Sequence, residues 1–158
     1  MLIALVVGTV GWFVFAGRGQ AVDANQVFVD ELIVLSNKER AAADLPELHV
    51  NDKLSTAAYQ KALDMLANNY FAHTSPDGVT PWFWIDQEKY QYIYAGENLA
   101  INFLTPQVTH VAWMKSESHR ENILNPHFDE VGIALARGVM NGKEAVIVVQ
   151  MFGKSVNF

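Results

Sequence analysis

Apolar positions recur at helical spacing soon after the start of the more polar part of the chain. Between residues 26 and 43, Phe28, Leu32 and Leu35 follow one another at intervals of three or four residues, which is the period of one helix face. Pro46 ends the segment, because the residue before a proline avoids helical backbone angles. The pattern predicts a helix over 26–43.

A second helix is predicted over residues 52–69, after a brief extended piece at 48–50. Asn51 is a favourable N-cap, because its side-chain oxygen can accept hydrogen bonds from the free amides of the first turn. One face of the segment is apolar and rich in small residues, so we expect the helix to pack closely on its neighbour: Leu54, Ala58, Ala62, Met65 and Leu66.

Three shorter helices are predicted from their start signals. A threonine followed by a proline suits the N-cap and the first helical position. Thr80-Pro81 therefore predicts a helix over 82–87, and Thr105-Pro106 predicts one that runs to about Lys115.

The third short helix is expected to begin near His119, because Ser118 and Glu121 fit a capping box. Asn125-Pro126 ends it. This interpretation puts His119 in the first helical turn.

The remaining apolar runs have the character of strands. Residues 92–101 are rich in Tyr, Ile and Leu, residues 131–136 alternate large with small side chains, and residues 144–152 are almost continuously apolar. A hairpin turn at 140–143 joins the last two strands. A strand that is apolar on both faces needs cover on both sides. We therefore predict an α+β fold whose sheet lies between helical layers.

The first seventeen residues are apolar and uncharged, and Arg18 closes them. Their length reaches the lower limit of a membrane-spanning helix, about 17–25 residues. They lack the basic start and the small-residue cleavage site of a secretory signal. An uncleaved transmembrane anchor is therefore preferred to a cleaved signal or to a buried helix of a soluble protein.

This interpretation divides the chain into an anchor over 1–17, a linker over 18–25 and a domain over 26–158. We expect the domain to lie outside the cytoplasm at the cell membrane, or to be secreted if the first segment is cleaved.

Charge and cysteine content exclude several classes of function. The net charge is −6 and the pI is near 5.2, and the eleven Lys and Arg residues are scattered, which argues against a nucleic-acid partner. The chain has no cysteine. Disulfides, thiolate metal sites and a cysteine nucleophile are therefore excluded.

One carboxylate, Glu97, stands inside the apolar run at 94–100 and needs partners if it is buried. His73 beside a turn and His119 at a helix start are the candidates. Two histidines and a carboxylate can hold a divalent ion such as zinc and leave a position open for water. The alternative is that these histidines are hydrogen-bonded structural residues.

Glu117 is a possible second carboxylate for such a site, and its alternative role is a solvated charge at a helix start. Ser75 and Ser118 lack the Gly-x-Ser-x-Gly turn of a serine nucleophile. No catalytic residue is therefore assigned firmly.

Six motifs follow one another along the chain: Leu35-x-Asn37-x-Glu39-Arg40, Leu54 with Ala57-Ala58, His73-Thr74-Ser75-Pro76-Asp77-Gly78, Gly96-Glu97-Asn98-Leu99-Ala100, Trp113-Met114-x-Ser116-x-x-His119-Arg120-x-Asn122-Ile123-Leu124, and Val131-Gly132-Ile133-Ala134. Each motif alone is loose, but in this order they resemble the CAP superfamily, also called the sperm-coating-protein-like domain. The resemblance is closest to the short bacterial branch and covers roughly residues 28–153.

The resemblance implies a three-layer α-β-α sandwich with a central antiparallel sheet and a cavity lined by two histidines and acidic residues, which binds zinc in some members. His73, Glu97 and His119 match cavity positions. A further acidic residue of many eukaryotic members falls near Ser116 or Glu117. The side chains expected to support the cavity are Ser75, Asn98, Ser116 and Asn122.

The leading functional hypothesis is a membrane-tethered domain that binds a protein, lipid or cell-wall fragment at the cell envelope and is not an enzyme. A metal-dependent hydrolase is the alternative, with a zinc-bound water at His73 and His119 and Glu97 as general base. Lipid or sterol carriage is a third hypothesis. Its motivation is a set of aromatic residues. Trp82, Phe83 and Trp84 are expected to cover the core, with an aromatic wall for a ligand as the alternative. Tyr90, Tyr92 and Tyr94 are expected to be exposed.

Overall fold

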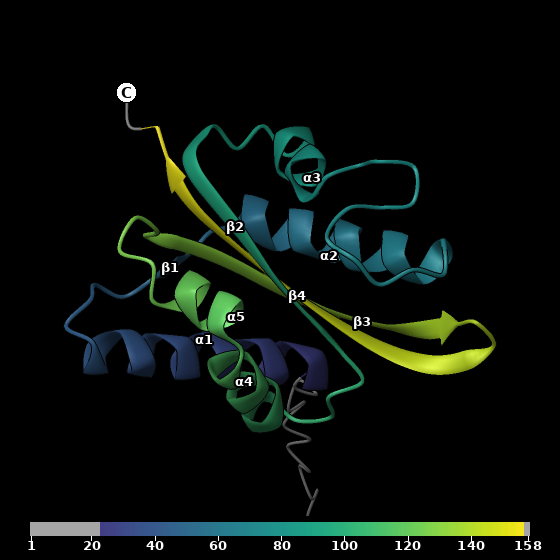
Figure 1. Ribbon diagram of the computed structural model, residues 1–158, viewed down its shortest axis with the longest axis horizontal. Helices are drawn as coiled ribbons and strands as arrows, with labels where there is room; N and C mark the ends of the chain where they lie inside the picture. Colours follow the sequence, from purple (N-terminus) through teal and green to yellow (C-terminus); the bar gives the residue numbers. More distant parts are fainter. Residues whose placement is uncertain (1–22, 157–158) are drawn as a thin grey trace, which may run out of the picture.

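A four-stranded sheet lies between two layers of helices in the computed structural model, which describes residues 23–156 (Figure 1). The strand order is β1-β3-β4-β2. The three long strands, β2, β3 and β4, are antiparallel, and the two-residue β1 adds to β3 in parallel. The strands are β1 (His49–Val50), β2 (Tyr92–Ile101), β3 (Glu130–Met140) and β4 (Lys143–Ser155). The α+β sandwich is confirmed, with a mixed sheet because of β1.

The five helices cover both faces of this sheet (Figure 1). They are α1 (Ala24–Ala42), α2 (Asp52–Ala67), α3 (Pro81–Gln87), α4 (Pro106–Lys115) and α5 (Glu117–Ile123). Residues of α2 and α3 share one buried apolar cluster with the sheet, and residues of α1, α4 and α5 share the other. The predicted helical cover on both sides is therefore present.

Strand β4 separates the two cores. Ile147, Val149 and Met151 belong to the cluster beneath α2, whereas Val148 and Phe152 belong to the cluster beneath α1. Successive side chains of a strand point to opposite faces, so a nearly continuous apolar run supplies both cores. This confirms the expectation that the last strand is covered on both sides.

The alternation of large and small residues in β3 sets the distance to α2. Gly132, Ala134 and Ala136 lie beneath that helix. A Cβ atom at Gly132 would lie 2.1 Å from the backbone nitrogen of Ser55 in α2. The absence of a side chain at Gly132 therefore allows α2 to rest directly on the strand.

Helix starts agree with the sequence at three positions and disagree at one. Thr80 is the N-cap of α3 and Pro81 its first residue, although the Thr80 side chain makes no capping hydrogen bond. The side chain of Asn51 accepts hydrogen bonds from the first-turn amides of α2, and Thr105 does the same for α4. The capping box of Ser118 is wrong. The amide of Arg120 donates to the carbonyl oxygen of Ser116, so α5 begins at Glu117 with Ser116 as its N-cap.

Arg40 of α1 binds the loop that follows α1 and the loop that follows α5 through hydrogen bonds. Its side chain is fully buried. The guanidinium donates to the carbonyl oxygens of Pro46, Ile123, Asn125 and Phe128, at distances of 2.8 to 3.0 Å. All four acceptors are backbone carbonyl oxygens, so their dipoles stabilise the buried positive charge.

The predicted anchor over 1–17 and most of the predicted linker lie outside the described residues. Helix α1 begins at Ala24, after the N-cap Asp23, and so includes the last two positions assigned to the linker. Across residues 23–156, no helix combines the length and the hydropathy that a bilayer crossing requires.

Candidate functional site

The site is built on β2, the strand at one edge of the sheet. Side chains alternate along a strand, so Glu97 and Asn98 point to opposite faces. Glu97 lies on the side of α2 and α3, like Leu99, whereas Asn98 lies on the side of α5, like Ala100. No other strand of residues 23–156 pairs with the outer edge of β2, and side chains of the helices bond to it instead: Asn122 donates to the carbonyl oxygen of Glu97 and Trp113 to that of Leu99.

The closest polar contact of the site joins Glu97 to His73. His73 Nδ1 lies 2.6 Å from Glu97 Oε1. The carboxylate is buried, with 2% of the side chain exposed, whereas the His73 side chain is 57% exposed. The pair therefore connects the strand interior to solvent, and it confirms that the expected partner of Glu97 is His73.

Burial and hydrogen bonding shift both groups toward their protonated forms. Burial raises the pKa of the Glu97 carboxyl, although the hydrogen bond from His73 and the positive charge of Lys61 act in the opposite direction. The pKa of His73 is also raised, because its ring donates to the Glu97 carboxylate. Both shifts favour the retention of a proton between the two side chains.

The loop after α2 positions His73 with help from Ser75. The hydroxyl of Ser75 accepts a hydrogen bond from the amide of Val79 at 3.0 Å, and its carbonyl accepts one from the amide of Gly78. Gly78 has a φ of +84°, a conformation that glycine adopts without steric cost. Ser75 thus shapes the turn that carries His73 and is not among the residues around the hollow described below.

Lys61 of α2 is a residue of the site that the sequence analysis missed. It is fully buried, and its Nζ donates to the carbonyl oxygen of His73 at 2.8 Å and to Tyr70 Oη at 3.1 Å. Tyr70 in turn donates to a carboxylate oxygen of Asp64. Burial lowers the pKa of Lys61, and the charge of Glu97 opposes that shift.

A signal for Lys61 was present in the sequence. Position 61 lies on the same face as Leu54, Ala58 and Met65, at helical spacing along the apolar stripe of α2. A lysine on a buried stripe requires partners for its charge. The partners come from the loop that carries His73.

Asn98 and Asn122 hold β2 and α5 together beneath the site. Asn98 Nδ2 donates to the carbonyl oxygen of His119 and to Gln150 Oε1, both at 3.1 Å. Asn122 Nδ2 donates to Asn98 Oδ1 at 2.9 Å and to the carbonyl oxygen of Glu97 at 3.1 Å. Gln150 continues the network to Ser36 of α1. These contacts give both asparagines a supporting role.

His119 is placed near the pair without joining it. Its backbone is held by Asn98, and its Nδ1 is buried with no hydrogen-bond partner among the described residues. Burial lowers the pKa of His119, and the charge of His73 adds to that effect. The ring is therefore favoured in its neutral form.

Residues 23–156 do not present a preformed three-residue zinc site. No three His, Asp or Glu side chains of this part of the chain are placed to hold a metal ion together. A catalytic zinc site uses three protein ligands, so the described arrangement of His73, Glu97 and His119 does not fit one. Zinc binding stays a prediction.

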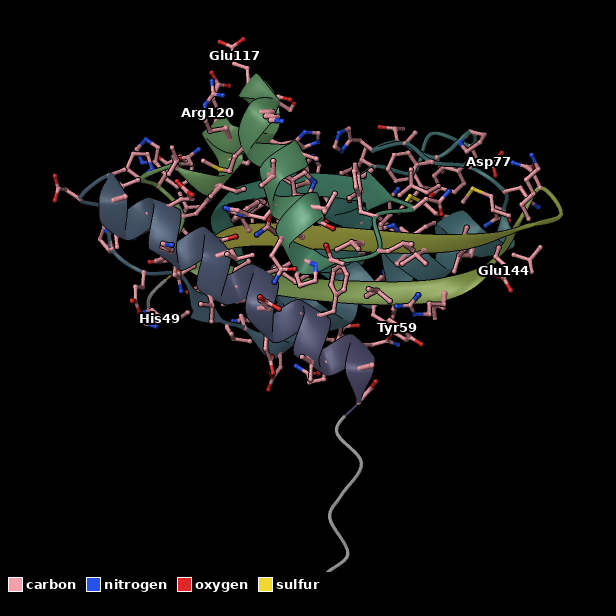
Figure 2. The ribbon with its side chains drawn as sticks, turned by 90° about the horizontal axis from the view of Figure 1, so that it is seen from below. His49, Tyr59, Asp77, Glu117, Arg120 and Glu144 are labelled. Atoms are coloured by element: carbon pink, nitrogen blue, oxygen red, sulfur yellow. The ribbon has the colours of Figure 1, made fainter. Side chains whose placement is uncertain are left out.

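Glu117 and Ser116 lie at the start of α5. Glu117 is exposed and makes no hydrogen bond or ion pair within the described residues, and Figure 2 shows its side chain projecting away from the domain. Ser116 Oγ lies 3.5 Å from Ser118 Oγ. The described positions of these side chains do not put either beside Glu97.

A hollow of about 410 Å³ opens beside Glu97. Pockets that hold small ligands measure about 300–1,000 Å³. Around it lie His73, Thr74, Thr80, Pro81 and Trp82 from the loop and α3, together with Ala95, Gly96 and Glu97 from β2 and Asn122 from α5. Glu97 Oε2 is buried and has no partner among the described residues. This carboxylate oxygen is therefore an acceptor that residues 23–156 leave unused.

The aromatic residues do not all have the exposure that the sequence suggested. Tyr90 is buried, because its hydroxyl donates to Glu130 Oε2 at 2.6 Å and its ring fills the space above Gly153. Tyr94 is exposed and stacks on His127. Trp82 and Trp84 pack against the core beneath α2, while Phe83 is exposed. The expectation of an exposed Tyr90 is wrong.

Comparison with known proteins gives one family model and two bacterial relatives. The family model "CAP: Cysteine-rich secretory protein family" matches residues 35–152. The protein YkwD of Bacillus subtilis (strain 168) is 40% identical over 103 residues, which cover 65% of this chain and 40% of YkwD. The membrane protein YlbC of the same organism is 27% identical over 107 residues, which cover 68% of this chain and 31% of YlbC. The matched part is thus less than half the length of either relative.

A solved structure supports the same assignment. The crystal structure of an extracellular protein containing a SCP domain from Bacillus anthracis str. Ames matches with a TM-score of 0.72 and 28% sequence identity. The match covers 83% of this chain and 41% of that chain.

Proposed function

The chain belongs to the CAP, or cysteine-rich secretory protein, family, and we propose that its domain is an extracytoplasmic binding module that takes a cell-wall fragment into the hollow beside His73 and Glu97. The residues around this hollow are suited to binding, because they combine a buried acceptor, an aromatic side chain and hydroxyl groups. They include no nucleophile paired with a base.

The observation that carries the proposal is the free oxygen of Glu97. Oε1 is used by His73, whereas Oε2 is buried without a partner among the described residues. Leaving a buried acceptor unpaired costs about 1–3 kcal/mol, and more for a charged group. A ligand that donates an N–H or O–H group to Oε2 removes this cost.

The walls of the hollow narrow the class of ligand. Thr74 and Thr80 offer hydroxyl groups, and Trp82 offers part of an indole ring. Sugars and short peptides present both polar groups and an apolar face, so they match such a lining. Fragments of the cell wall contain both kinds of unit.

The proposed location at the envelope draws on the relatives and on the first residues. One similar structure is that of an extracellular protein, and one relative is a membrane protein. The apolar run over 1–17 has the minimum length of an anchor. A tethered domain outside the cytoplasm would meet the cell wall directly.

A metal-dependent hydrolase is the second candidate, favoured by the unpartnered Nδ1 of His119 and Oε2 of Glu97. It requires a different arrangement of His73, Glu97 and His119, because these side chains do not form a metal-binding group within residues 23–156. Ligand binding needs one donor group to reach the buried Oε2 and does not need three side chains to converge on one ion, so it is the preferred proposal.

The test is a calorimetric titration of the full 158-residue chain with soluble disaccharide-peptide fragments from a muramidase digest of peptidoglycan. We expect binding by the unaltered chain, and binding at least tenfold weaker in Glu97→Gln, because one charge-assisted hydrogen bond contributes about 1.5–3 kcal/mol. Glu117→Gln is the matched control, since that carboxylate is exposed and makes no hydrogen bond or ion pair within residues 23–156. Equal binding by Glu97→Gln, or no binding by the unaltered chain, contradicts the proposal.

A further inference from the structure

Most of the outer edge of β3 has no neighbouring strand among the described residues. Strand β1 pairs only with Glu130 and Val131. The amide of Asn51 donates to the carbonyl oxygen of Val131, so the backbone groups of Val131 point away from β4. Backbone direction alternates along a strand, and the pairing of β3 with β4 keeps one register without a bulge. The amides and carbonyls of Ile133, Leu135 and Arg137 therefore also point outward.

These outward groups are unusual because they are recessed. Within residues 23–156, the backbone groups of Ile133, Leu135 and Arg137 make no hydrogen bond on that side. Ile133 is only 3% exposed and Leu135 only 4%. Buried backbone groups are almost always paired, since an unpaired one costs as much as a lost hydrogen bond. This edge thus offers unpaired backbone N–H and C=O groups that an additional strand could bind.

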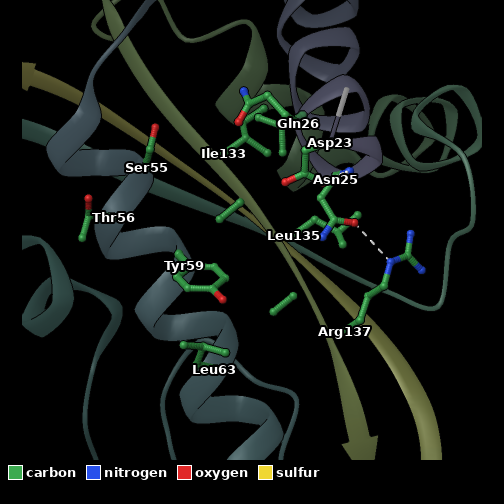
Figure 3. Close-up of a pocket in the computed structure, with 13 residues that line it drawn as sticks. Asp23, Asn25, Gln26, Ser55, Thr56, Tyr59, Leu63, Ile133, Leu135 and Arg137 are labelled. Atoms are coloured by element: carbon green, nitrogen blue, oxygen red, sulfur yellow. Dashed lines mark hydrogen bonds between the residues drawn. The ribbon is translucent and has the colours of Figure 1, made fainter. Parts of the chain in front are cut away.

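A hollow of about 530 Å³ runs along this edge (Figure 3). Helix α2 forms one wall, with Tyr59 and Leu63 one turn apart and both more than 40% exposed. The start of α1 forms the other wall with the polar side chains of Asn25 and Gln26. The floor is the backbone of β3. Ser55 and Thr56 also line the hollow on the α2 side, and Val29 lines it on the α1 side. Tyr59 and Leu63 are therefore an apolar patch within a hollow of mixed polarity.

We propose that the outer edge of β3 binds an extended segment of a partner protein as an additional strand of the sheet. The bound segment places apolar side chains against Tyr59 and Leu63 and polar side chains against α1. Such an alternation is the natural pattern of a strand, whose side chains point to the two faces in turn. Residues Ile133 to Arg137 span about 17 Å, the length of about five extended residues.

Arg137 lies at one end of the hollow, and its positive charge favours a negatively charged residue in the bound segment. The guanidinium is exposed, and within the described residues its one hydrogen bond is from Nε to Asn25 Oδ1, at 3.2 Å. Arginine binds a carboxylate through two parallel hydrogen bonds. Asp23 also lines the hollow, with its carboxylate bonded to the amide of Asn25. The partner segment therefore carries its acidic residue against the exposed guanidinium of Arg137 and a neutral residue beside Asp23. An antiparallel orientation is favoured by its stronger ladder, which puts the acidic residue at the amino end of the segment.

A second copy of this chain is a poor occupant. Its own β3 edge is recessed between α1 and α2. The helices of two copies would therefore collide before the two edges reached the spacing of paired strands, about 4.8 Å. A single extended segment has no such flanking helices. It can reach the floor of the hollow.

The test uses amide NMR on the full 158-residue chain and two capped heptapeptides of alternating valine and threonine. One peptide has glutamate at its amino end and the other has lysine there. In the free protein, we expect the amides of Ile133, Leu135 and Arg137 to exchange with solvent faster than those of Ala134 and Ala136, which pair with β4. The glutamate peptide should shift and protect the three outward amides, and bind at least tenfold more tightly than the lysine peptide.

Two variants separate strand addition from a nonspecific contact. Arg137→Pro removes an outward amide without removing a bond to β4, so it should abolish binding, whereas Val139→Pro, at an outward position beyond the hollow, should not. Arg137→Glu should reverse the preference between the two peptides and does not depend on a proline substitution. Three results would each overturn the proposal: no shift at millimolar peptide, shifts away from β3, or outward amides already protected in the free chain.

Discussion

His73 Nδ1 lies 2.6 Å from Glu97 Oε1, which joins the loop after α2 to the edge strand β2 across 24 positions of the sequence. The carboxylate is buried and the imidazole is mostly exposed. A proton held between them is therefore accessible from solvent, while the charge it balances lies inside the protein. A ligand in the adjacent hollow would therefore interact with both the shared proton and the carboxylate charge.

The first prediction concerns the titration of His73. In Glu97→Gln the ring loses the carboxylate that raises its pKa, so the pKa of His73 should fall. Ring NMR signals followed against pH measure it directly. His110 of α4, whose Nε2 lies 3.6 Å from Glu39 Oε1 of α1, is the control and should titrate as before. An unchanged His73 titration would contradict the pair.

The second prediction concerns stability against pH. The pKa of His73 in the folded protein is raised above 6.5. The stability that it contributes is therefore fully present below pH 6.5 and is lost as the pH rises through the raised pKa. The difference in unfolding free energy between the unaltered chain and His73→Gln should shrink as the pH is raised from 6.5. Denaturant unfolding at several pH values checks the sign, and a growing difference would refute it.

The third prediction concerns the network beneath the site. Asn98→Ala removes donors to His119 and Gln150 and the acceptor of Asn122. Leaving buried polar groups unpaired should lower the unfolding free energy by about 1–3 kcal/mol. Gln60→Ala, which removes one exposed hydrogen bond to Glu88, should change it by less than about 0.5 kcal/mol. Equal effects of the two substitutions would show that the network contributes little.

The fourth prediction concerns the contact between β3 and α2. Gly132→Ala places a methyl group 2.1 Å from the backbone nitrogen of Ser55, so it should destabilise the fold by about 1–3 kcal/mol or more. Gly138→Ala meets only the end of the Leu66 side chain at 3.1 Å, which can rotate away, and should cost much less. Thermal unfolding of both variants makes the comparison. A milder effect at Gly132 would mean that α2 is free to move.

The sequence predicted much of this fold because local signals and tertiary packing agree. The period of the helices, the caps Asn51 and Thr105 and the two-faced apolar run of β4 all lead to the observed elements. The ends of elements were less predictable. Strand β3 continues to Met140 because its pairing with β4 extends to the hairpin, although Arg137 and Gly138 interrupt the apolar pattern.

The candidate site was predicted only where residues carry an unusual local context. Glu97 in an apolar run and His73 beside a turn are such residues, and the structure brings them together. Lys61 was missed although its place on the apolar stripe of α2 requires partners, which are the hydroxyl of Tyr70 and the carbonyl oxygen of His73 in the following loop. The contacts of Arg40 were missed because its partners are backbone carbonyls of distant loops, which leave no pattern in the residue types. Within residues 23–156 the His119 ring makes no hydrogen bond to His73 or Glu97, while its backbone carbonyl accepts one from Asn98, on the opposite face of β2 from Glu97.

The most direct test of the central claim is a map of amide and indole shifts in the full chain as it is titrated with disaccharide-peptide fragments of peptidoglycan. If the hollow beside His73 and Glu97 binds them, the largest shifts should fall on Thr80, the indole of Trp82 and the amides of Gly96 and Glu97. Shifts that cluster instead along β3, or that are absent at saturating fragment, would contradict the assignment of this hollow as the binding site.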